Sequence, residues 1–116
     1  MISLYLKKNL LIIVMELTIA IISYNKLKYI KSLLKSLNDI KIDNLEIIVI
    51  DNGSIENGLL DFLELQLREN IISKLFKLKE NNICKTKNLI FQEANFENVL
   101  ILTDELNFVG NNNILQ

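Results

Sequence analysis

Hydrophobic and polar positions along the chain alternate between short apolar runs and longer amphipathic stretches. The short runs cover residues 16–23, 45–51, 73–79 and 98–102, and polar residues bound each of them. Three are almost continuously apolar and rich in β-branched residues, which predicts strands buried on both faces. The run at 73–79 alternates apolar and polar residues, which predicts a strand nearer an edge of the sheet.

Between the predicted strands, apolar residues recur at helical spacing. The first predicted helix has Asn25 available as its cap. The second covers residues 55–70, with Ser54 as its cap, and the third covers residues 85–94. The apolar faces of the first two helices consist of Ile30, Leu33, Leu34, Leu37, Leu59, Phe62, Leu63 and Leu67.

This strict alternation of strand and helix predicts the fold class. It indicates an open α/β sheet with parallel strands and right-handed crossovers. We see no internal repeat and no low-complexity linker, and the chain has no proline. We therefore expect one compact unit.

Residues 1–15 stand apart from this alternation. "MISLYLKKNLLIIVM" has two lysines before an apolar run, but no small-residue cleavage site follows, and Glu16 ends the run before the ~20 residues that a membrane helix needs. We interpret residues 1–15 as an N-terminal extension, with Met15 as an alternative start. A peripheral membrane anchor is the second interpretation.

Composition narrows the chemistry. The 116 residues are half hydrophobic, which excludes disorder and fits a single domain. The net charge is −1, so the chain lacks the excess of basic residues that nucleic-acid-binding proteins use, and we do not expect it to bind nucleic acid. Without histidine, acid–base or metal chemistry must come from carboxylates, lysines or hydroxyls. The single cysteine, Cys84, favours a reducing cytoplasm, and we expect it to be a buried small hydrophobe.

Candidate functional residues follow each predicted strand, because open α/β sheets bind ligands outside the carboxyl ends of their strands. The segments are "SYN" (23–25), "DNGS" (51–54), "ENNICKTKN" (80–88) and "TDE" (103–105). None of them is a glycine-rich dinucleotide fingerprint or a P-loop, so a phosphate cradle of that kind is not expected.

Each candidate has a plainer interpretation. The "DNGS" segment is typical turn chemistry, although Asp51 could also accept hydrogen bonds from a nucleoside. Asp104 and Glu105 could simply solvate a strand end, yet adjacent carboxylates suit a hard divalent cation such as Mg²⁺ or Mn²⁺. Lys87 is either a solvated helix charge or a partner for a phosphate.

Taken together, these segments resemble a known family. "LTIAIISYNKLKYIKSLLKSL" and "LEIIVIDNGSIENG" are similar to the opening of family-2 glycosyltransferases, which have the GT-A nucleotide-diphospho-sugar transferase fold. Glu56 stands where an acid often follows the "DNGS" motif. "KNLIFQEANFENVLILTDE" is similar to the family's Arg-Asn helix and the strand that carries its DxD motif. The resemblance covers residues 16–108, and leaves residues 109–116 as a C-terminal tail. It places Tyr24 and Asp104 in one cleft, which implies that the first and fourth predicted strands are neighbours.

The resemblance implies a glycosyltransferase that uses a nucleotide-diphosphate sugar donor and a divalent cation. The donor would be bound by Ser23, Tyr24, Asn25, Asp51, Asn52, Lys87 and Asp104. Asp104 and Glu105 would hold the metal, although Thr103 replaces the first acid of DxD and Glu105 replaces the last. The acceptor, whether glycan, lipid or protein, stays unassigned. A role in cell-surface polysaccharide synthesis, in the cytoplasm or at the inner face of the membrane, would follow.

The chain also lacks counterparts of the family's second half, which carries the acceptor site and the general base. We therefore expect an inactive portion, with the edge of strand 98–102 open to self-association. Two alternatives are a non-catalytic nucleotide-binding remnant and a receiver-like signalling module. A receiver would need acids after the first predicted strand, where this chain has "SYN".

Overall fold

A computed structural model of the chain describes residues 3–7 and 10–103, with side chains from residue 15 onward. Its elements, in chain order, are β1 (Ser3–Lys7), β2 (Leu10–Ser23), α1 (Leu27–Asn38), β3 (Lys41–Asn52), α2 (Leu59–Arg68), β4 (Lys74–Leu78), α3 (Ile83–Glu93) and β5 (Val99–Thr103).

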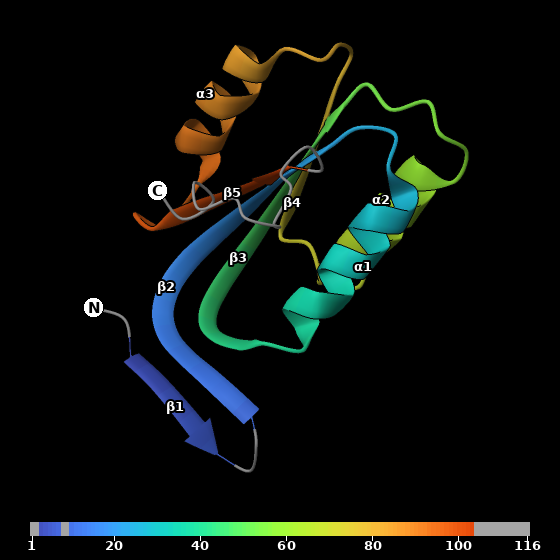
Figure 1. Cartoon of the computed structure of the whole chain (residues 1–116). Helices are drawn as coiled ribbons and strands as arrows, with labels where there is room; N and C mark the ends of the chain where they lie inside the picture. Colours follow the sequence, from blue (N-terminus) through green and yellow to red (C-terminus); the bar gives the residue numbers. More distant parts are fainter. Residues whose placement is uncertain (1–2, 8–9, 104–116) are drawn as a thin grey trace, which may run out of the picture.

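The strands form one sheet with β2 at its centre. β2 pairs in parallel with β3 on one side and with β5 on the other, and β4 pairs in parallel with β3 (Figure 1). The parallel α/β sheet is confirmed, as is the adjacency of the first and fourth predicted strands. β4 is the edge strand that its alternating sequence predicted.

The N-terminal segment adds something that the sequence analysis did not predict. β1 pairs antiparallel with the first part of β2, which begins at Leu10 rather than at residue 16. Val14 is opposite Asp43 and Leu17 is opposite Leu45, so two residues of β2 face Asn44 alone. Asn44 has a φ of 61°. This β-bulge separates the β1 side of the sheet from the part that the helices cover, and β2 and β3 curve strongly (Figure 1).

Helices cover both faces of the sheet. α1 and α2 lie on one side and α3 on the other (Figure 1). Odd-numbered residues of β2, such as Ile19 and Ile21, pack with the α1 and α2 residues Ile30 and Leu63. Even-numbered residues of β2 and β3 pack with Ile90 of α3. Each fully buried aliphatic side chain contributes about 1.5–3 kcal/mol, so the two apolar layers hold the helices to the sheet.

Three local predictions were wrong. Leu67 was assigned to the apolar face of α2, but it is 36% exposed because α2 is shorter than expected and Leu67 lies in its last turn. Cys84 is exposed rather than buried, since it lies in the first turn of α3 on the side away from the sheet core. Neither Asn25 nor Ser54 caps the helix that follows it: α1 begins after Lys26, and α2 begins after Gly58.

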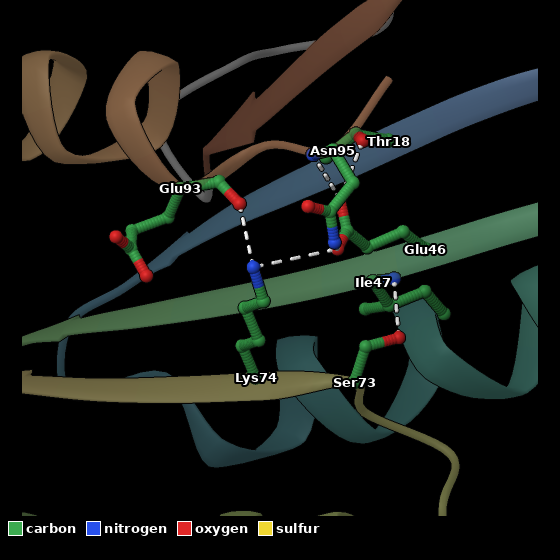
Figure 2. A network of polar contacts seen from close by, with 7 residues as sticks. All are labelled: Thr18, Glu46, Ile47, Ser73, Lys74, Glu93 and Asn95. Atoms are coloured by element: carbon green, nitrogen blue, oxygen red, sulfur yellow. Dashed lines mark hydrogen bonds and ion pairs between the residues drawn. The ribbon is translucent and has the colours of Figure 1, made fainter.

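A polar network around the buried Glu46 joins β2, β3 and β4 to the segment between α3 and β5 (Figure 2). The Thr18 hydroxyl and the Asn95 amide nitrogen donate to Glu46 Oε1 at 2.7 and 2.9 Å, and Asn95 Nδ2 donates to Oε2 at 2.6 Å. Lys74 Nζ lies 3.7 Å from Oε2 and donates to the Glu93 carbonyl. The network fixes the connection from α3 to β5.

The same network sets the ionisation of Glu46. Burial raises the pKa of the Glu46 carboxyl, but hydrogen bonds from Asn95 and Thr18, together with the nearby Lys74 ammonium, more than offset this effect. The net pKa therefore lies below the usual range of a glutamate. Glu46 is ionised at neutral pH although only 6% of it is exposed.

Candidate functional site

The strand order reverses between β2 and β5. From β2 the chain passes through α1 to β3 and on to β4, and it then returns through α3 to β5 on the opposite side of β2. Such a switch in strand order opens a crevice at the carboxyl ends of the two neighbouring strands, where α/β proteins bind ligands. Segment 23–25 leaves one of these ends, and the residues after Thr103 leave the other.

Ser23 and Asp51 are neighbouring buried polar residues at this end of the sheet. Ser23 closes β2 with 0% exposure, and it is the register partner of Asp51 on β3, which is 1% exposed. Among the residues that the structure describes, the Ser23 hydroxyl is the one buried side-chain polar group without a hydrogen-bond partner. An unpaired buried hydroxyl is costly, so it marks a place where a ligand group or water would be stabilised. Tyr24, next in the chain, is 42% exposed.

Asp51 also holds its own turn. Ser54 donates its amide nitrogen to Asp51 Oδ2 at 2.8 Å and its hydroxyl to Oδ1 at 2.5 Å. The "DNGS" segment thus forms the turn that the sequence analysis gave as its plainer interpretation. Two hydrogen bonds use about half of the acceptor capacity of a carboxylate, so Asp51 can still accept from a ligand.

Gly53 completes the turn by close packing. Its φ is 84°, and a Cβ on it would lie 2.9 Å from the Lys79 carbonyl oxygen. No other residue fits this position without movement of the segment that links β4 to α3.

Asn52 faces the other side of the sheet from Asp51. Its Nδ2 donates to Asn81 Oδ1 at 3.0 Å, and its Oδ1 accepts from the Thr86 hydroxyl at 2.9 Å. Asn82 caps α3 by accepting from the Lys85 amide at 3.2 Å. These bonds attach the start of α3 to the end of β3, so they give Asn52 a structural role.

Asn25 contacts the neighbouring loop. Its backbone has a φ of 49°, and its Oδ1 accepts from the amides of Ile55 and Glu56 at 2.7 and 3.0 Å. Glu56 Oε1 in turn accepts from the amide of Leu27 at 2.6 Å. Glu56 therefore makes the capping contact at α1 that the sequence analysis assigned to Asn25. The sequence signal that pointed to Glu56 was its position as the acidic residue that follows "DNGS".

Tyr29 is a residue of this site that the sequence analysis did not single out. Its hydroxyl donates to the Thr103 carbonyl at 3.1 Å, which joins the first turn of α1 to the end of β5. The partners are 74 residues apart in sequence, so no local pattern could reveal them.

The predicted metal ligands Asp104 and Glu105 lie outside the described residues. Within residues 3–7 and 10–103, no group of three potential ligands could hold a metal ion. Lys87 lies on the exposed surface of α3, two residues after Lys85.

Cavities lie at both ends of the sheet. A cavity of about 470 Å³ beyond the carboxyl end of β4 is lined by Lys77, Leu78, Lys79, Glu80 and Lys85. At the opposite end, a groove of about 540 Å³ runs between α1 and β3, and its lining includes Leu37, Ile42 and Asn70.

The helices give no sign of a membrane span: among those that the structure describes, none is long and apolar enough to cross a membrane.

Comparison with known proteins gives one result. A family model described as glycosyl transferase family 2 matches residues 18–105, more than half of the chain. The match starts just after the β-bulge and includes the carboxyl ends of all four parallel strands. No curated protein and no solved structure matches the chain.

Proposed function

The chain belongs to glycosyl transferase family 2, and on that premise we propose that it binds a nucleotide-diphosphate sugar at the carboxyl ends of β2, β3 and β5. The observation that carries the proposal is the unpaired Ser23 hydroxyl, buried beside Asp51 at the point where the strand order reverses. The exposed Tyr24 ring lies next to it in the chain.

The nucleoside would occupy the β2–β3 side of this edge. The Tyr24 ring would stack on the base, since an exposed aromatic face next to polar groups suits a planar heterocycle. Asp51 would accept a hydrogen bond from the base, and the Ser23 hydroxyl would pair with a polar atom of the nucleoside. Asn25 and Asn52 belong to the same edge, but their oxygens already accept protein hydrogen bonds.

The diphosphate would lie toward β5 and α3. Lys87 would approach its oxygens as a point charge. Asp104 and Glu105 offer oxygen ligands only, a donor set that fits Mn²⁺ or Mg²⁺. When bound, such an ion would neutralise negative charge on the leaving nucleoside diphosphate.

The proposal also covers the class of the sugar acceptor and the cellular location of the protein. A glycan, lipid or protein hydroxyl would receive the sugar, as in synthesis of a cell-surface polysaccharide. The exposed free Cys84 favours a reducing compartment such as the cytoplasm. Association with the inner face of a membrane and self-association along β5 stay predictions, since β5 pairs with β2 alone among the described strands.

Calorimetry on the full chain tests donor binding. We expect a uridine or similar nucleoside diphosphate to bind weakly with Mn²⁺, and Asp51→Ala to lose more affinity than Asn52→Ala. Asn52 is a matched control because it is the adjacent residue, equally buried and also hydrogen-bonded, but on the other face. Equal losses in the two variants would reduce Asp51 to its role in the turn.

Transfer is a separate question from binding. A positioned general base typically contributes ~10²–10⁴-fold, and no described residue has been assigned to activate an acceptor. We therefore expect no multiple-turnover transfer from nucleotide sugars to mixed acceptors, which would fit a nucleotide-binding unit without catalysis. Glycoside formation that Glu105→Ala abolishes would contradict this expectation.

A further inference from the structure

Two loops at the proposed donor site are joined by hydrogen bonds between residues about 30 positions apart. The first loop, as we define it, covers residues 23–26, the last residue of β2 and its connection to α1. The second covers residues 51–58, the last two residues of β3 and its connection to α2. The Asn25 amide nitrogen donates to the Ser54 hydroxyl at 2.8 Å, and Ser54 donates onward to Asp51 at 2.5 Å. The Asn25 side-chain oxygen accepts two amides of the second loop, at 2.7 and 3.0 Å.

Glu56 completes the connection in the opposite direction. Its Oε1 accepts from the amide of Leu27, the first residue of α1, at 2.6 Å. The N-cap residue of α1, Lys26, makes no side-chain capping bond, and the first turn of α1 contains no acidic residue. A carboxylate from the other loop thus supplies the favourable negative charge at the start of α1.

These contacts suggest how Asn25 acts. Its side-chain oxygen has both lone pairs engaged by the amides of Ile55 and Glu56. Its left-handed φ of 49° is one that asparagine adopts more readily than most residues. Both features describe a residue that shapes the loop, and neither requires contact with a ligand.

We propose that Asn25 and Glu56 are positioning residues, which join loops 23–26 and 51–58 into one unit and so fix the position of Tyr24 relative to Asp51. This inference rests on the proposed donor site, because Tyr24 and Asp51 are the groups that the joined loops present to the nucleoside. Pre-organised loops lose less conformational entropy when the ligand binds, which raises its affinity.

Asn25→Gly and Asn25→Asp test the role of Asn25. Glycine tolerates the positive φ but removes the acceptor, whereas aspartate keeps an acceptor oxygen at the same place. We expect Asn25→Gly to weaken nucleoside diphosphate binding about tenfold, the effect of losing two modest hydrogen bonds. Asn25→Asp should restore most of that affinity.

Amide hydrogen exchange on the ligand-free chain gives a readout that does not depend on nucleotide. In Asn25→Gly, the amides of Ile55 and Glu56 should exchange faster, and in Asn25→Asp they should stay protected. Glu56→Ala should speed exchange at Leu27, and Glu56→Gln, which keeps the acceptor oxygen, should restore protection there.

Hydrogen exchange tests whether the two loops are joined, and nucleoside diphosphate affinity tests whether that joining supports donor binding. Unchanged exchange at Ile55 and Glu56 in Asn25→Gly would overturn the joining of the loops, whatever the binding result. If Asn25→Asp binds as weakly as Asn25→Gly while its amides stay protected, restoring the contacts between the loops has not restored binding, and the positioning role of Asn25 is wrong. If the unmodified chain binds no nucleoside diphosphate, the proposed function fails, and the exchange data alone decide whether the loops form one unit.

Discussion

Glu46→Gln is the most informative change outside the proposed site, because glutamine keeps the shape of the buried side chain but removes its charge and one of its two acceptor oxygens. The Oε1 position can still accept from the Thr18 hydroxyl and the Asn95 amide nitrogen. The Oε2 position becomes an amide nitrogen. It then faces Asn95 Nδ2, which now donates to Oε2 at 2.6 Å, and Lys74 Nζ at 3.7 Å.

The expected loss follows from those two contacts. One hydrogen bond is replaced by two facing donors, and a partly buried ammonium loses its counter-charge. Leaving buried polar groups unpaired in this way costs about 1–3 kcal/mol. Urea unfolding at pH 7, followed by circular dichroism, measures this change in the free energy of unfolding. Glu64→Gln is the control: Glu64 also pairs with a lysine of β4, Lys77, but both side chains are nearly half exposed, so stability should stay nearly unchanged.

The effect should also depend on pH. The pKa of Glu46 is lowered in the folded chain, so the unfolded chain binds the proton more readily. The stability from the ionised carboxylate is therefore complete above the unfolded pKa of about 4.3 and is lost as pH falls through the lower, folded pKa. The difference between the unmodified chain and Glu46→Gln should shrink below about pH 4. Equal stability at pH 7, or a difference that does not change with pH, would refute this account of the network.

Two other predictions concern residues that shape the site. Gly53→Ala should destabilise the chain by about 1–3 kcal/mol, and more than Gly58→Ala. Both glycines have a φ near 85°, but a Cβ at Gly53 would lie 2.9 Å from the Lys79 carbonyl oxygen, whereas the nearest atom to a Cβ at Gly58 is a flexible leucine carbon at 3.9 Å. Equal decreases of the melting temperature in the two variants would argue against close packing at Gly53. Tyr29→Phe removes the hydroxyl that holds the Thr103 carbonyl, so Mn²⁺-dependent nucleotide affinity should fall while Mn²⁺-independent affinity changes little. An equal fall with and without Mn²⁺ in calorimetry would mean that Tyr29 does not position the residues after β5.

The parallel sheet could be predicted because its signals are local. The buried strands read as continuous apolar runs, and Ile30, Leu34 and Leu37 of α1 are all buried as their spacing indicates. Strand ends were less accurate: β3 begins at Lys41, four residues before the predicted start. Its first residues pair with the N-terminal part of β2, a segment that the sequence analysis had set aside as an extension.

The polar contacts of the site could not be predicted in the same way. Asn25 and Ser54 have typical capping side chains, and a local rule assigns each to the helix that follows it. In the fold, each side chain has another partner that is closer. The second loop, about 30 residues away in sequence, engages Asn25, and Asp51, three residues earlier in the chain, engages Ser54. Glu56 and Tyr29 act across the same distances or longer ones. Motif positions indicated which segments matter, but only the packing of β2 against β3 and β5 showed which atoms meet.

Chemical-shift mapping by ¹⁵N NMR on the full chain tests the central claim most directly. Titration with a nucleoside diphosphate and Mg²⁺, which unlike Mn²⁺ is not paramagnetic, should shift the amides of segments 23–25 and 51–54 and leave Asn38, Lys41 and Asn70 unchanged. The latter three line the groove between α1 and β3 at the opposite end of the sheet. Shifts confined to that groove, with none at Tyr24 or Asp51, would contradict a donor site at the carboxyl ends of β2, β3 and β5.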